Sequence, residues 1–116
     1  MRSIDLVLAH RKRRSQRVIL DVPLLVRGES EDKRAFEEDA LTLIVNAHGA
    51  LVMLEEKVVL GQKVILTNIK SGDEREGSVR YVGPAYAGVV RVGIQFSRPA
   101  PEFWLLSSPP TDWSQF

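Results

Sequence analysis

The chain has 116 residues, of which 44% are hydrophobic and 27% are charged, and its formal net charge is +1. These values suit one folded domain and exclude a disordered chain. The lack of cysteine excludes disulfides, thiolate nucleophiles and cysteine-ligated metal sites. No apolar run approaches the roughly 20 residues of a membrane helix, and the early apolar stretch precedes the positive block, the reverse of a secretory signal. We therefore expect a cytoplasmic domain with no membrane partner.

Residues 1–12 are expected to form a leader, and a basic block overlaps its end. The block RKRRSQR, residues 11–17, holds five of the 16 basic residues of the chain. Within it, Arg13 and Arg17 have the spacing R-x-x-x-R. Guanidinium groups bind phosphate oxygens in pairs of hydrogen bonds, reach the O6 and N7 edge of guanine, and stack on aromatic rings. The block is therefore either an arm for an anionic, guanine-containing ligand or a solvated linker, as most charge runs are.

Alternating apolar residues predict a first strand at 18–27. Pro23 lies within it and cannot donate a ladder hydrogen bond, which indicates an edge position or a bulge. Residues 28–40 are polar and acidic and are expected to form a connection that includes the start of the next strand. Five further strands are expected at residues 41–46, 50–54, 63–69, 74–82 and 90–96.

Two turns between these strands have a backbone reason. Asn46 and Gly49 are residue types that tolerate positive φ, so the chain is predicted to reverse direction between them. Residues 71–73, Ser-Gly-Asp, are expected at the tip of another turn.

The segment 97–113 has a different composition, with four of the six prolines and both tryptophans. Pro101 suits the first position of a short helix, because its missing N–H group has no partner there in any case. Phe103 and Trp104 are expected to lie across an opening of the sheet.

Six short strands separated by turns predict an all-β fold, a six-stranded antiparallel barrel with a short C-terminal helix. Closure would remove the exposed strand edges that a small chain cannot leave bare. A two-sheet sandwich is the alternative. The expected boundaries are 1–12 for the leader, 13–106 for the barrel and 107–116 for a tail.

The sequence offers no recognisable catalytic site, and we expect a protein that is not an enzyme. It lacks the G-x-S-x-G, phosphate-loop and H-E-x-x-H patterns. The two histidines, His10 and His48, lie on different segments without an acidic cluster, which argues against a metal site. The acids of residues 29–39 are interpreted as a solvated loop rather than an acid–base pair.

The order of these features resembles that of the PilZ domain family. R-x-x-x-R comes first, followed by a strand, an acidic loop, a strand that ends in a glycine-containing turn, and a closing strand VGIQF. The family's second motif, [D/N]-x-S-x-x-G, aligns with Ile44, Asn46 and Gly49. The likeness runs from about Arg11 to Phe96.

The resemblance implies a six-stranded barrel that binds cyclic di-GMP, a bacterial second messenger. It assigns phosphate and guanine contacts to Arg13 and Arg17, with Arg14 assisting, and places Asn46 and Gly49 at the ligand. No cofactor or metal is implied. Ile44 departs from the motif, because it cannot accept hydrogen bonds from the guanine edge where an acid or amide could.

Two functions follow from this comparison. The first is a cyclic di-GMP receptor, and the alternative is a degenerate adaptor that binds a partner protein without nucleotide. The adaptor's candidate surface is Phe103, Trp104, Leu105, Leu106 and Tyr86, although large apolar residues more often belong to the core of a small barrel. Nucleic-acid binding is disfavoured, because barrels that bind it interleave aromatic and basic residues on their strands.

Overall fold

The computed structural model describes residues 15–30 and 32–114. Its strands form one antiparallel sheet. They are β1 (Val18–Ile19), β2 (Pro23–Glu29), β3 (Ala35–Asn46), β4 (Gly49–Leu54), β5 (Lys63–Asn68), β6 (Glu74–Val82) and β7 (Val90–Phe96). Within the described ranges, no helix has the length and apolarity needed to cross a membrane.

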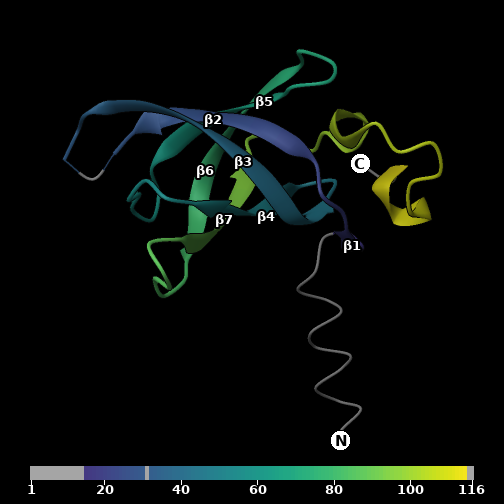
Figure 1. The fold of residues 1–116 in the computed structure, drawn as a ribbon. Helices are drawn as coiled ribbons and strands as arrows, with labels where there is room; N and C mark the ends of the chain where they lie inside the picture. The colour runs from purple at the N-terminus through teal and green to yellow at the C-terminus, as the bar shows by residue number, and fades with distance from the viewer. Residues whose placement is uncertain (1–14, 31, 115–116) are drawn as a thin grey trace, which may run out of the picture.

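The sheet closes on itself. Its strand order is β1-β3-β2-β5-β6-β7-β4, and an additional pairing between β3 and β4 joins the two sides into a barrel of six strands (Figure 1). The two-residue β1 lies outside this ring and pairs with the end of β3. The predicted six-stranded antiparallel barrel is confirmed, and the sandwich alternative is wrong.

The predicted first strand is split into β1 and β2. The break lies at residues 20–22, where the hydroxyl of Thr42 on β3 accepts a hydrogen bond from the Val22 N–H at 2.9 Å and donates one to the Leu20 carbonyl. Pro23 stands at the first position of β2, where a missing N–H group is tolerated. The Thr42 side chain therefore replaces part of the backbone hydrogen bonding between β3 and residues 20–22. The alternating sequence gave no indication of this break in the strand.

The barrel interior is filled by the inward side chains and by aromatic residues from the C-terminal segment. Val92, Ile94 and Phe96 are buried, as their alternation on β7 predicts. The Phe103 ring packs edge-on against Phe96, with ring centroids 5.3 Å apart, and against Trp104, at 4.9 Å. These rings cover one end of the barrel.

Two short 3-10 turns stand where a C-terminal helix was expected. They are η1 (Pro101–Trp104) and η2 (Thr111–Ser114). Pro101 begins η1 as predicted, but Leu105 adopts a left-handed conformation with φ of 60°, which ends the turn after four residues. The expected short helix is therefore wrong in type and length.

Phe103 and Trp104 are core residues, so they do not belong to the adaptor surface proposed around them, whereas Leu105 and Tyr86 of that surface are exposed. Asn68, itself buried, holds η1 in place, since its side-chain amide donates to the Phe103 carbonyl at 2.8 Å. Trp113 of η2 is also buried, so part of residues 107–116 packs on the barrel. The three segment boundaries remain predictions.

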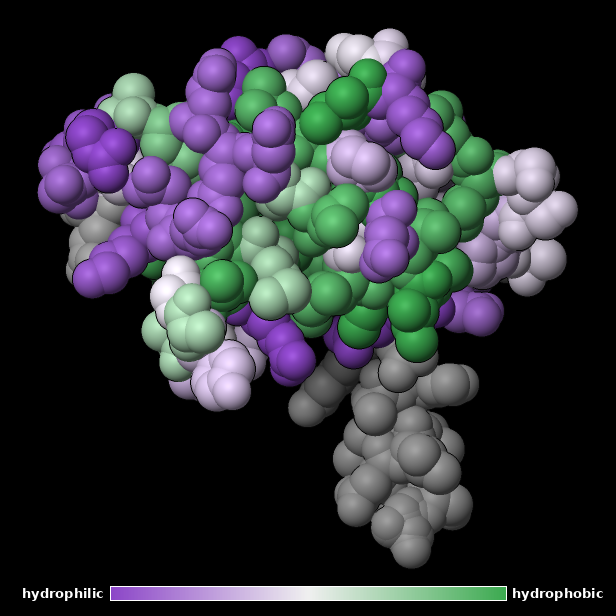
Figure 2. Space-filling model, in the orientation of Figure 1, coloured by the Kyte–Doolittle hydropathy of each residue, from purple (hydrophilic) through white to green (hydrophobic). Residues whose placement is uncertain are grey.

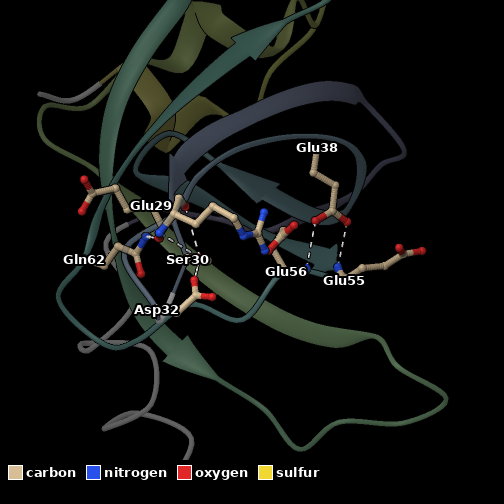
Figure 3. Close-up of polar contacts among 8 residues, drawn as sticks. Glu29, Ser30, Asp32, Glu38, Glu55, Glu56 and Gln62 are labelled. Atoms are coloured by element: carbon tan, nitrogen blue, oxygen red, sulfur yellow. Dashed lines mark hydrogen bonds and ion pairs between the residues drawn. The ribbon is translucent and has the colours of Figure 1, made fainter.

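The end of the barrel at the β2–β3 hairpin is polar and internally bonded (Figure 3). The Glu38 carboxylate accepts hydrogen bonds from the backbone N–H groups of Glu55 and Glu56, at 2.7 and 3.0 Å. The Ser30 hydroxyl donates to the Asp32 carboxylate, which lowers the pKa of that carboxyl. Two acids that the sequence assigns to a solvated loop are thus bonded within the protein, Asp32 inside the β2–β3 loop and Glu38 to the segment that follows β4.

Candidate ligand-binding site

The end of the basic block is fixed to the β3–β4 turn. Ser15 is only 1% exposed, and its hydroxyl oxygen accepts a hydrogen bond from the Ala47 N–H at 3.1 Å. The same oxygen lies 3.1 Å from Nδ1 of His48. Ser15 thus contacts two consecutive residues of the turn, Ala47 and His48. Arg17 follows Ser15 by two residues, so its backbone lies close to the Asn46–Gly49 turn.

The next residue ties this segment to the C-terminal tail. The Gln16 N–H donates to both carboxylate oxygens of Asp112, at 3.2 and 2.9 Å. The indole N–H of Trp113 donates to the Gln16 carbonyl at 2.7 Å. Both the N–H and the carbonyl of Gln16 are therefore hydrogen-bonded. These bonds fix the position of the backbone from which the Arg17 side chain extends.

Asn46 shapes the turn and presents a donor. Its Oδ1 accepts a hydrogen bond from the His48 N–H at 2.8 Å, and its backbone carbonyl accepts one from the Trp104 indole at 2.7 Å. A backbone N–H can only donate, so Oδ1 must face it and the amide NH2 group must point away. Asn46 is left with a donor, suited to a phosphate oxygen or to guanine O6.

Gly49 is required by packing. A Cβ atom at this position would lie 1.9 Å from the Ile94 carbonyl oxygen, so no side chain fits between β4 and β7. Gly93 on β7 also leaves its place on the outer face empty, and a Cβ there would lie 3.0 Å from Cβ of Tyr81. Because neither glycine carries a side chain, the outer surface of the sheet is recessed at these two positions.

This hollow is a pocket of about 490 Å³, a size typical of small-molecule sites. It lies on the outer face of the barrel over β3, β4, β7 and β6, as the strand pairings show. Its floor is a cross-strand row in which Ile44 pairs with Leu51, Leu51 with Gly93, and Gly93 with Tyr81. The residues that line it include Arg17, Ile44, Asn46, His48, Leu51, Arg80, Tyr81 and Gln95.

The pocket has a cationic rim. Arg17 and Arg80 line it, and no aspartate or glutamate among residues 15–30 and 32–114 does. Among the residues that the structure describes, neither guanidinium has a carboxylate partner, whereas Arg27, Arg34 and Arg75 are each paired with an acid. Unpaired guanidinium groups above a largely apolar floor favour an anionic ligand with flat apolar faces.

The structure brings together three of the predicted site residues, because Arg17, Asn46 and Gly49 all line this pocket. Arg13 and Arg14 lie outside the described residues, so their part in the site remains a prediction. Ile44 lines the pocket as well, at the position where the family motif has an acid or amide.

Sequence reasoning missed Arg80, Tyr81 and Gln95. Strict alternation along residues 74–82 would place Arg80 and Tyr81 on opposite faces. The register between β6 and β7 shifts between Val79 and Tyr81, which allows both residues to line the pocket. The sequence offered one indication of these residues, the consecutive arginine and tyrosine near the end of the predicted strand 74–82. Such pairs are too common to predict a binding site.

Comparison with known proteins gives a fold likeness. No protein-family model and no curated protein matches the chain. The structure is similar to that of the Borreliella burgdorferi PlzA protein, solved in complex with c-di-GMP, with a TM-score of 0.62 and 17% identity over 95% of this chain. It is also similar to the Bacillus subtilis inhibitor of motility MotI/DgrA, with a TM-score of 0.58 and 16% identity over 81% of this chain.

The chain spans 44% of the length of the first of these proteins and 46% of the second. At such identities the likeness concerns the fold alone, and it supports the PilZ-like barrel predicted from the sequence. In the described part of the chain, no group of three or more His, Cys, Asp or Glu side chains could hold a metal ion.

Proposed function

We propose that this protein binds cyclic di-GMP in the pocket between Arg17 and Arg80. One observation carries the proposal: the bonds of Ser15 to the β3–β4 turn hold Arg17 near Asn46, and no carboxylate from the part of the chain that the structure describes lines the pocket. Cyclic di-GMP has two phosphates, which match guanidinium groups, and two guanines, whose faces match the apolar floor. The PlzA structure with bound c-di-GMP supports the choice of ligand within this fold.

The ligand would be held mainly by charge and stacking. Ile44 offers no acceptor for the N–H groups of guanine, and Oδ1 of Asn46 is already bonded to the His48 N–H. A lost hydrogen bond near a charge costs about 1–3 kcal/mol, which is roughly 10- to 100-fold in affinity. We expect binding that is micromolar or tighter, because the arginines and stacking remain. Arg13 and Arg14 would add further contacts from outside the described residues.

Isothermal titration calorimetry with cyclic di-GMP tests the proposal. We expect saturable binding by the wild type and a loss of at least about 10-fold in affinity for Arg17→Ala, because one charge-assisted contact is removed. Arg98→Ala is the matched control, since Arg98 is exposed and does not line the pocket. Absence of binding by the wild type at low salt would refute the proposal.

Ile44→Asp asks whether the departure from the motif limits affinity. A carboxylate at this position could accept the two N–H donors of the guanine edge, as the family motif implies. We expect tighter binding of cyclic di-GMP and a greater preference for it over cyclic di-AMP. Unchanged affinity for both nucleotides would place the guanine edge elsewhere.

The second candidate function, partner binding without nucleotide, is favoured by exposed apolar side chains. Leu41 on β3 and Met53 on β4 are exposed, and Ile19 on β1 is 87% exposed. Figure 2 shows hydrophobic residues gathered over the middle of the face on which β3 and β4 lie. A pull-down that depends on Leu41 and ignores Arg17 would support this function instead.

A further inference from the structure

We propose that Arg80 and Tyr81 contact the ligand directly: Arg80 binds a phosphate, and the Tyr81 ring stacks on a guanine. The inference rests on the proposed function and names two residues outside both family motifs. Both lie on β6, far in sequence from Arg17 and Asn46, and both line the same pocket.

A β-bulge on β6 allows these two neighbouring residues to line the same pocket. On β6, Val79 pairs with Ile94 and Tyr81 pairs with Gly93, so Arg80 is an extra residue without a partner on β7. Val79 is buried inside the barrel, whereas Tyr81 is 50% exposed and Arg80 is also exposed. Two residues that oppose one partner lose strict alternation, which is how bulges redirect side chains at binding sites.

Space for a planar group exists beside Tyr81. Its cross-strand partner is Gly93, which has no side chain, and the next residue in the row is Leu51 on β4. The Tyr81 ring extends along β6 toward Gly83, with its Oη and Cε2 at 3.1 and 3.3 Å from the Cβ position of that glycine, and the residue is 50% exposed, so a base bound over Gly93 could reach the ring. Purine bases stack on such rings, and stacking does not require hydrogen bonds to the edge of the base. This matters here because Ile44 cannot accept such hydrogen bonds.

Arg80 and Arg17 line the same pocket from distant parts of the sheet. Arg17 precedes β1, and the strands β3, β4 and β7 separate β1 from β6. Neighbouring strands lie about 4.8 Å apart, so the backbone segments that carry the two arginines are several strand spacings apart. A ligand with two separated phosphates can engage both cations at once, whereas a mononucleotide would reach only one.

Calorimetric titration of the full chain with cyclic di-GMP tests this inference. We expect Arg80→Ala to weaken binding by about 10-fold or more, as for one charge-assisted contact. Tyr81→Leu should weaken it by about 5- to 100-fold, in the range of a lost base stack, and Tyr81→Phe should retain affinity because the ring remains. GMP should bind the wild type far more weakly than the dinucleotide.

Two exposed residues outside the pocket give matched controls. Arg98→Ala removes an arginine and Tyr86→Leu removes a tyrosine that is 85% exposed on the β6–β7 loop. Both should bind within about twofold of the wild type, and all variants are checked by thermal unfolding. If Arg80→Ala does not fold, Arg80→Gln replaces it, because its amide keeps the polar bulk without the charge.

The outcomes separate the inference from the proposed function. If the wild type binds and Arg17→Ala does not, but the Arg80 and Tyr81 variants bind like the controls, this inference is wrong and the proposed function stands. If the wild type itself gives no binding, both are wrong. Loss of affinity in Arg80→Ala and Tyr81→Leu, with the controls unchanged, supports the inference.

Discussion

The two ends of β3 use charged residues in opposite ways. At its start, in the β2–β3 hairpin, acids are bonded within the protein: Glu38 to two backbone N–H groups, and Asp32 to Ser30. At its other end, Asn46 lines a pocket together with Arg17 and Arg80, which have no carboxylate partner in the described ranges. Figure 2 shows the first end as a hydrophilic region over the β2–β3 hairpin.

This contrast separates charges that stabilise the fold from charges that are available to a ligand. A bonded carboxylate contributes to stability, and its removal leaves backbone donors without a partner. An unpaired guanidinium in a pocket contributes little to folding and can bind an anion. Substitutions at the two ends should therefore affect different measurements.

Gly49→Ala should have the largest effect on stability, because it disturbs the backbone of the strands that form the pocket. Its Cβ would lie 1.9 Å from the Ile94 carbonyl oxygen, so β4 and β7 must separate. We expect a loss of about 3 kcal/mol or more in unfolding free energy, measured by denaturant titration. Gly28→Ala on β2 is the control, since its nearest atom is a Val64 methyl at 3.1 Å. Equal losses would contradict this account.

Glu38→Ala should lower stability without changing ligand affinity. It removes the acceptor of two backbone N–H groups, for a cost of about 1–2 kcal/mol at this partly exposed position. Chemical denaturation and calorimetry on the same sample give both values. Arg17→Ala should lower ligand affinity without changing stability. If both variants lower ligand affinity, the two ends of β3 do not differ in function.

Asn46→Asp should lower affinity while preserving the turn. Aspartate keeps an oxygen to accept the His48 N–H, so unfolding free energy should change by less than about 1 kcal/mol. It replaces the outward NH2 donor with negative charge beside the arginines, so cyclic di-GMP should bind several-fold more weakly. A stable variant that binds as tightly as the wild type would show that Asn46 does not face the ligand.

The smallest effect concerns pH at the hairpin end. The hydrogen bond from Ser30 lowers the pKa of the Asp32 carboxyl in the folded state. Its stabilising contribution is therefore present at neutral pH and is lost as the pH falls through that lowered pKa. Ser30→Ala should move the midpoint of Asp32 upward in a carboxyl NMR titration, with no change in ligand affinity at pH 7. An unmoved midpoint would exclude the hydroxyl as the cause.

Much of the fold was predictable because its strands alternate cleanly. β7 and β6 match the expected ranges 90–96 and 74–82, and the turn between Asn46 and Gly49 lies where expected. The split of the first strand was not predictable, because it depends on the Thr42 side chain bonding to residues 20 positions away in sequence.

The candidate site was predictable only in part. The motifs led to Arg17, Asn46 and Gly49, which meet in one pocket. Arg80 and Tyr81 were missed because a register shift is a property of two paired strands and leaves no mark on either alone. The role of Ser15 was equally hidden, since a serine inside a basic run gives no sign of burial.

Both tryptophans donate their indole N–H to backbone carbonyls next to the site, Trp104 to Asn46 and Trp113 to Gln16. The protein thus carries two intrinsic fluorophores, each attached to a segment that a ligand would touch. Any movement of the turn or of the residues before Arg17 would change indole hydrogen bonding and shift the emission. Occupancy of the pocket should be readable in unlabelled protein, and replacing each tryptophan by phenylalanine in turn would tell which segment moves.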